Sequence, residues 1–450
     1  MKFIPNASLK DDMLRDLGID HIDDLFDDIP SSVKRQRLTL HKGRSQQETE
    51  RILRTLANRN LSSCDSLCFT GGGIKPHYIP AVVRSIISRG EFLTAYTPYQ
   101  SEASQGFLQA MFEYQSMIAE ITGMDVANCS LYDGATALAE AMMMCSRVKP
   151  KKQHFLIPTH ISWEKKSVLK NYAQGIDLTI KEIPYDTRTG MIDIEQAERL
   201  ISSDVCGIYI ENPNFFGMFE QEVTAVHELI SDVDGLFVVG VDPLSLGIVK
   251  NPGEYGADIV VGEARALGNP MDLGGSSLGL FACRSSYLRQ MPGRLIGKTS
   301  DAEGNDAFCM TLQTREQHIR RQKATSNICT NEGLCALAAT VYLAWLGGNG
   351  FQALSKQNFE QGQLLEKTLT SLDLFESLFS GVHFNECALR SRIDASTINK
   401  TLLQSHIHGG LHLDPWFKDL TNTLLFGVTE LHSKEDIEHL ATVLSEVSHV

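Results

Sequence analysis

The chain has 450 residues, and its 41 Lys and Arg against 55 Asp and Glu give a formal net charge of −14. Nucleic-acid binding needs a basic face, so this acidic balance argues against it and favours small molecules or proteins as partners. The 42% hydrophobic and 21% charged residues are typical of a folded globular protein, and neither of a disordered chain nor of a membrane bundle.

Neither a membrane span nor an export signal is apparent. The longest apolar run, residues 334–346, is shorter than the roughly 20 residues that a spanning helix needs. Asp11 and Asp12 interrupt the N-terminal stretch where an export signal would be apolar. We therefore predict a cytoplasmic protein without membrane contact.

The ten cysteines are too dilute for a disulfide scaffold. Cys64 and Cys68 are spaced CxxxC, but no second pair with the spacing of a zinc site follows nearby. We predict no metal site.

Residues 1–74 are predicted to form a helical arm. Met13, Leu14 and Leu17 recur three to four residues apart, and Gly18 is a plausible helix stop. The segment lacks the strand signals of an independent α/β core. Arms of this kind commonly pack on a second subunit.

Residues 75–330 are predicted to form a large, doubly wound α/β domain. Short apolar runs alternate there with amphipathic segments, which indicates a parallel sheet covered on both faces by right-handed crossovers. Residues 331–450 return to helices mixed with short strands, and we predict a smaller C-terminal α/β domain for them. The apolar runs are residues 154–158, 206–213, 236–243, 258–263 and 277–284.

Ligands of α/β sheets bind at the carboxyl ends of the strands, so the residues that follow the apolar segments are candidates. The first candidate is the turn of Asp133, Gly134 and Thr136, which leads into a buried Ala- and Met-rich helix. Free N–H groups and the positive dipole end at such a helix start suit a phosphate. The alternative is that Asp133 or Thr136 simply caps the helix.

Two further candidates follow strands. Asp242 ends a buried run, where a carboxylate is costly unless it meets a cation such as a protonated pyridine nitrogen. The alternative is an Asp-Pro turn in which the side chain bonds its own backbone. The turn at residues 212–217 carries two aromatics, and it either walls a pocket or is a surface turn with buried aromatics.

The fourth candidate is the segment 262–268, which follows the run 258–263. In a pyridoxal phosphate (PLP) enzyme the Schiff-base lysine should appear here, and only lysine can form that aldimine. No Lys occurs between Lys250 and Lys298. Dinucleotide-binding, P-loop, hydrolase-elbow and zinc-protease motifs are also absent from the sequence.

Three long segments, residues 91–106, 112–141 and 314–339, carry a resemblance that runs nearly end to end. They closely resemble subunit 1 of the two-subunit glycine dehydrogenase (decarboxylating), the P-protein of the glycine cleavage system. The resemblance implies a fold type I PLP-dependent architecture, with subunits 1 and 2 as homologous halves of a heterotetramer. In that family the Schiff-base lysine belongs to subunit 2, and Ala266 is the matching position here.

The resemblance also implies a reaction. With subunit 2, the chain would decarboxylate glycine, release CO2 and transfer the aminomethyl group to the lipoyl arm of H-protein, with PLP as the electron sink. This chain would be inactive alone and hold no catalytic residue, although it would contribute to a shared site. The loop with Thr97 and Tyr99 is the predicted contribution; its alternative is a buried connection at the subunit interface.

Several positions depart from the pattern of the relatives. Lys75 and Pro76 stand where an aromatic and a polar residue are usual, and a His is usual at Ser162. Ser276 and Ser277 replace a Pro-aromatic pair.

Two other hypotheses stay open. One is a self-sufficient PLP enzyme that uses Lys323, although that lysine follows a strand and a long predicted helical segment, the wrong place for this fold. The other is a structural or regulatory subunit with no share in the active site.

Overall fold

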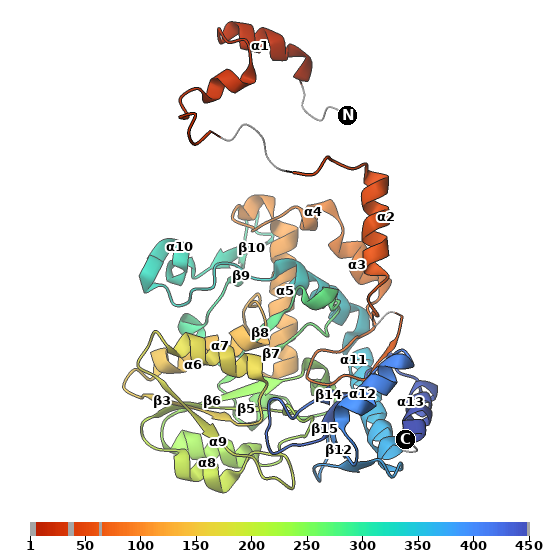
Figure 1. Cartoon of the computed structure of the whole chain (residues 1–450). Helices are drawn as coiled ribbons and strands as arrows, with labels where there is room; N and C mark the ends of the chain where they lie inside the picture. The colour runs from red at the N-terminus through yellow and green to blue at the C-terminus, as the bar shows by residue number, and fades with distance from the viewer. Residues whose placement is uncertain (1–5, 35–39, 63–64, 448–450) are drawn as a thin grey trace. The chain divides into compact units, whose positions relative to one another are not determined.

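The computed structural model describes residues 6–34, 40–62 and 65–447, and the chain divides into two units, residues 1–61 and 62–450 (Figure 1). The first unit is helical, and none of its helices has a buried residue. Gly18, with φ +70°, follows the predicted first helix. The helices are η1 (Ala7–Leu9), α1 (Lys10–Asp16), η2 (Ile22–Phe26) and α2 (Gln46–Ala57).

The second unit is built around a seven-stranded sheet in the order β2-β8-β7-β6-β5-β3-β4. Every predicted apolar run contains one of its strands, and β5 and β6 are buried along their whole length because helices cover both faces. The strands are β2 (Val126–Ala127), β3 (His154–Pro158), β4 (Thr179–Ile183), β5 (Val205–Glu211), β6 (Leu236–Val241), β7 (Ile259–Glu263) and β8 (Gly279–Cys283).

The expectation of a parallel sheet holds for β4, β3, β5, β6 and β7 but is wrong for β8, which pairs antiparallel with β7. The connection from β7 to β8 carries only the 3-10 helix η6 (Asp272–Gly274). A parallel neighbour would need a longer crossover, usually a helix. The short connection therefore turns the chain back along the sheet.

Helices α6 and α7 lie on one face of the sheet, and α8 and α9 lie on the other (Figure 1). The predicted long helical face is α5, which ends at Gly123 in the left-handed conformation. The helices up to this point are α3 (Ala81–Ile87), α4 (Gly90–Leu93), α5 (Gln105–Thr122), α6 (Gly134–Val148), α7 (Trp163–Ala173), α8 (Ile194–Leu200) and α9 (Val223–Asp232).

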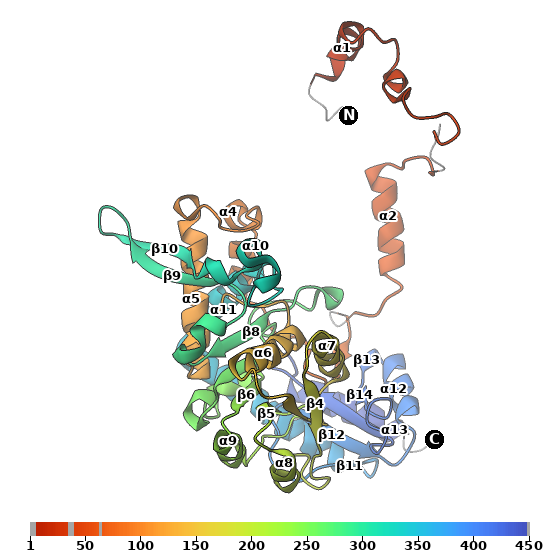
Figure 2. The same ribbon diagram turned by 90° about the vertical axis from the view of Figure 1, so that its left-hand side faces the viewer.

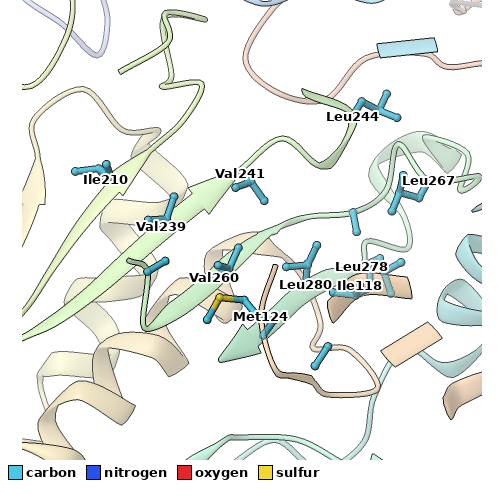
Figure 3. Close-up of a cluster of buried hydrophobic side chains, with 14 of the residues drawn as sticks. Ile118, Met124, Ile210, Val239, Val241, Leu244, Val260, Leu267, Leu278 and Leu280 are labelled. Atoms are coloured by element: carbon cyan, nitrogen blue, oxygen red, sulfur yellow. The ribbon is translucent and has the colours of Figure 1, made fainter. Parts of the chain in front are cut away.

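Apolar side chains from the sheet form the core beneath the carboxyl ends of the strands. Figure 3 shows Val239 and Val241 of β6 beside Val260 of β7, with Leu278 and Leu280 from the β8 segment. All five are at most 7% exposed. Burial of apolar area contributes about 25 cal/mol per Å² removed from water, so this cluster stabilises the strand ends in their positions.

The C-terminal part forms a four-stranded antiparallel sheet in the order β11-β12-β15-β14, with α12 and α13 against it (Figure 2). Its core also takes up Leu365 and Leu369 from the end of α11. Its elements are α11 (Gly333–Thr370), β11 (Phe375–Ser377), β12 (Glu386–Ser391), α12 (Ala395–Gln404), β13 (Ile407–His408), β14 (Leu411–His412), β15 (Thr423–Gly427) and α13 (Lys434–Val447).

Residues before position 75 pair with strands of the C-terminal part, in a separate two-stranded parallel sheet and by one bridge to β15. The strand β1 (Leu67–Cys68) pairs with β13, and Thr70 forms a bridge with Phe426. The predicted arm of residues 1–74 thus contains a strand, which the sequence pattern did not show because its partner lies far along the chain.

Helix α11 is, by length and composition, the one helix of residues 6–34, 40–62 and 65–447 that could cross a membrane. Non-helical backbone at Gly347 (φ 59°, ψ 179°) divides it into two segments. Ala336, Ala338 and Tyr342 of the first segment are nearly inaccessible to solvent. This burial is that of a core helix.

The segment between β8 and Lys323, predicted as long and helical, is instead an antiparallel hairpin, β9 (Leu295–Ser300) and β10 (Asp306–Thr311). Short helices follow, α10 (Gln317–Arg320) and η9 (Arg321–Lys323). The prediction failed because the hairpin residues are mostly half-buried or exposed and show little alternation of apolar side chains.

Candidate functional site

A cavity of about 420 Å³ opens at the carboxyl ends of the parallel strands. Glu211, Asp242 and Glu263 line it from the ends of β5, β6 and β7. Ligands of α/β proteins bind at this edge because strand ends and helix starts converge there. The loop before α3, at positions 72–75 and 77, and positions 384–386 also line the cavity.

The structure brings together four of the positions that the sequence singled out. Asp133, Gly134, Asp242 and Ala266 all line the cavity. Thr136 is not among the described residues that line the cavity. The Thr136 N–H donates to Asp133 Oδ1 over 2.6 Å. Asp133 is therefore the N-cap of α6, which is the arrangement of the helix-capping alternative.

The Glu263 carboxylate contacts the turn at the start of α6, for which the sequence suggested a phosphate. Its Oε2 accepts the Gly134 N–H over 3.1 Å, and its Oε1 accepts the N–H groups of Arg265 and Leu278 over 3.0 and 2.9 Å. Burial raises the pKa of this carboxyl, against the hydrogen bonds and the Arg265 charge, which lower it. A carboxylate of the chain itself thus meets the amide at the start of α6.

Sequence reasoning missed Glu263, although a signal was present. It ends a buried strand, as Asp242 does, and the same cost of a buried carboxylate applies to both.

Asp242 bonds its own backbone. Its Oδ1 accepts the Leu244 N–H over 2.9 Å, so it caps the short helix η4 (Pro243–Gly247). This is the arrangement of the Asp-Pro turn alternative, and the residue also lines the cavity.

Both lysines among the described lining residues are held in ion pairs. Lys75 Nζ lies 2.6 Å from Glu386 Oε1, and their side chains are 3% and 8% exposed. Lys165 Nζ lies 2.5 Å from Glu211 Oε1, which also accepts the Tyr209 hydroxyl over 2.7 Å.

Burial lowers the pKa of each lysine, but the carboxylates outweigh it. For Lys75 the charges of Glu386, Asp242 and Glu430 raise the pKa above its ordinary value. For Lys165 the pKa is likewise raised, chiefly by Glu211. An ammonium held in its charged form is a poor nucleophile, because only the free amine attacks a carbonyl.

The position after β7 also fails the requirements of a covalent PLP site. Ala266 lines the cavity and offers no amine. Arg265 beside it is 5% exposed, and its guanidinium donates to Met271 O, Gly275 O and Ser277 Oγ. Arg265 therefore fixes the glycine-rich loop around Ala266. The residues present do not fit an aldimine-bound cofactor in this chain.

The turn at residues 212–217 contributes to the cavity wall. Pro213, Asn214, Phe215 and Gly217 line it, and Phe216 is fully buried behind them. Ser162 lines it from the start of α7, and its buried hydroxyl has no hydrogen-bond partner.

The loop of Thr97 and Tyr99 is not part of the described wall of this cavity. The Tyr99 side chain is 58% exposed. The guanidinium of Arg294, 4% exposed, donates to Thr97 Oγ1 and, over 2.9 Å, to Thr330 Oγ1, and it lies 5.6 Å from the Tyr99 ring centroid. A buried cation thus holds an exposed aromatic loop, a contact that the sequence did not reveal.

Lys323, the alternative Schiff-base candidate, ends η9 and is exposed, away from the described cavity wall. No group of three or more His, Cys, Asp or Glu suited to a metal ion occurs among residues 6–34, 40–62 and 65–447. Cys64 of the CxxxC pair lies outside the described residues.

The likeness of this chain to solved structures shows its class, the fold type I architecture of PLP-dependent enzymes. Lactobacillus brevis glutamate decarboxylase has the same fold, with a TM-score of 0.68 at 11% identity over 93% of this chain and 96% of that one. A crystal structure of the glycine cleavage system P-protein in inhibitor-bound form matches with a TM-score of 0.90 at 38% identity, covering 99% of this chain and 100% of that chain.

The family model of the glycine cleavage system P-protein matches residues 1–444. A Thermococcus kodakarensis protein named "Probable glycine dehydrogenase (decarboxylating) subunit 1" is 47% identical over 447 residues, 99% of this chain and 98% of the relative. The chain belongs to the P-protein family and is a subunit 1 of the glycine cleavage system's glycine decarboxylase.

Proposed function

We propose that this chain is the subunit without the aldimine lysine in a two-subunit glycine decarboxylase. With a lysine-bearing subunit 2 it decarboxylates glycine, releases CO2 and passes the aminomethyl group to the lipoyl arm of H-protein. PLP supplies the electron sink in subunit 2. We expect this complex in the cytoplasm and no activity from this chain alone.

The observation that carries the proposal is Ala266 at the end of β7. The lysines nearest to it in the cavity are Lys75 and Lys165, and both are held as ammonium ions by buried carboxylates. No step of cofactor chemistry is therefore assigned to this chain. The proposed contribution of this chain is to position side chains of the loop with Thr97 and Tyr99 for contact with subunit 2.

Thr97 and Tyr99 are the residues that we propose for the shared site. An exposed tyrosine held by a buried arginine is presented in a fixed orientation, which lowers the ordering cost when a partner surface closes over it. Aromatic side chains of this kind dominate the binding energy of many interfaces. The loop thus offers both contact area and a hydroxyl.

Borohydride reduction of the purified chain with PLP, followed by peptide mass mapping, tests the absence of an aldimine. We expect no labelled lysine. A labelled Lys323 would establish the self-sufficient enzyme instead, and a labelled Lys165 would show that its pair with Glu211 does not protect it.

Glycine–bicarbonate exchange by subunit 2, with and without this chain, tests the joint enzyme. We expect exchange only when both are present. Exchange by subunit 2 alone at an unchanged rate would support the structural or regulatory alternative.

A further inference from the structure

The cavity has room for a cofactor, so its volume does not exclude one. About 420 Å³ lies within the range of ordinary small-molecule sites. Exclusion of a phosphate-bearing ligand would therefore have to result from the charged side chains that line the cavity.

The first such charge is Glu263 at the start of α6. The helix has 15 residues, and its dipole and first N–H groups favour an anion there. Glu263 Oε2 takes the Gly134 N–H, and a Cβ built on Gly134 would lie 3.0 Å from Glu263 N. The strand end and the helix start are thus in close contact, with the carboxylate between them. A phosphate would have to displace a buried carboxylate or accept its repulsion.

The second charge is Lys75. It reaches the cavity from the loop before α3 and pairs with Glu386, which also accepts the Gly73 N–H over 2.9 Å. Lys75 and Asp242 line the same cavity, and the Asp242 charge acts on the Lys75 ammonium. A cationic ring nitrogen that binds near Asp242 would therefore share the cavity with the Lys75 ammonium.

We infer that Glu263 and Lys75 are built-in counter-ions of this pocket, Glu263 in the position of an anionic group at α6 and Lys75 in that of a cationic group near Asp242. Both positions are thereby occupied by groups of the chain itself, and the pocket takes up no free pyridoxal phosphate. This inference deepens the proposed function, on which it rests, by naming the residues that keep the cofactor in subunit 2.

The geometry makes a gain of binding testable. A266K supplies an amine, and E263S removes the carboxylate while keeping a hydroxyl for the Gly134 amide. We expect A266K alone to take up little PLP, and A266K/E263S to bind PLP at least tenfold more tightly. Binding is measured by equilibrium dialysis and by borohydride labelling at position 266. Equal uptake by the two variants, or none by A266K/E263S, would overturn the role of Glu263.

Lys75 is tested in the same background. Adding K75M should tighten PLP binding further, by about tenfold, because the ammonium near Asp242 is gone. The matched control is K166M. Lys166 also forms an ion pair, with Glu182, but it is not among the described residues that line the cavity. If K75M and K166M have the same effect, Lys75 is no counter-ion of the site.

A second measurement does not depend on how the variants fold. The wild-type chain should show no rise in Tm with millimolar PLP or inorganic phosphate, because a ligand that binds only the folded state raises Tm. A Tm rise of several degrees in either ligand would overturn the inference. These assays use this chain alone. Failure of the joint enzyme is seen only in the exchange assay with subunit 2, so the two failures are distinguishable.

Discussion

The cavity and the Thr97 loop use arginine and lysine in opposite ways. In the cavity, Lys75 and Lys165 are paired with carboxylates and held away from chemistry. At the loop, the buried guanidinium of Arg294 contacts the ring of the exposed Tyr99. The difference teaches that the same kind of side chain can close a pocket by pairing with carboxylates or can order an exposed loop by binding its hydroxyl and its aromatic ring.

Breaking the buried pair of the cavity should have the largest effect. Lys75→Met leaves Glu386 buried without its partner, and removing one member of such a pair costs about 3–5 kcal/mol. We expect the free energy of unfolding in urea to fall by that amount. Lys434→Met, which removes an exposed pair with Glu438, should change it by about 0–1 kcal/mol. Similar losses in both variants would show that the cavity pair is not structural.

Glu430, the partner of the cavity-lining His77, should also make stability depend on acid pH. Burial raises the pKa of Glu430, but the hydrogen bond to His77, its charge, and the donors Tyr78 N and Asn358 outweigh it and bring the pKa to about 2. The folded pKa lies below the ordinary value of 4.5. The stabilisation is therefore complete above about pH 4.5 and is lost as the pH falls toward 2.

This contribution is on the order of 3 kcal/mol. Urea unfolding of the wild type and of Glu430→Gln between pH 5 and pH 2 measures it. We expect the wild type to lose more stability than the variant over this range. Parallel curves would place the acid sensitivity in other carboxylates.

The loop should respond through activity rather than stability. Arg294→Lys keeps the charge but loses the planar fork that reaches Thr97 and Thr330 together. We expect the exchange turnover of the complex to fall about 10- to 100-fold, because small displacements of positioning groups have effects of this size. Turnover should fall more than KM rises.

Arg284→Lys is the matched control for this arginine. Arg284 donates to the backbone carbonyls of Ala257 and Gly253, as Arg294 does to that of Cys329, but Arg284 directly follows β8. An equal loss of turnover in the control would mean that any change to a carbonyl-binding arginine disturbs the complex.

The smallest effect belongs to Lys323. It is exposed in η9, and surface substitutions of this kind usually change stability by less than about 0.5 kcal/mol. Lys323→Met should leave exchange by the complex and urea unfolding unchanged. A loss of exchange above tenfold would reopen the hypothesis that this lysine reacts.

The sequence predicted the seven-stranded sheet well but the two-stranded sheets outside it poorly. Buried runs such as residues 236–243 became strands because apolar segments of this length suit a sheet covered on both faces. The half-buried hairpin of β9 and β10 and the short strand β1 escaped notice. Their hydrogen-bond partners, not their composition, make them strands.

The sequence by itself determined what this chain lacks and to which family it belongs, since Ala266 and long segments of resemblance are local facts. Only the tertiary structure decided what fills the pocket. Glu263 meets Gly134 across 129 positions and Lys75 meets Glu386 across 311. Arg294 reaches Thr97 across 197. Contacts at such separations leave no trace in local periodicity, because the packing of distant elements alone brings the two partners together.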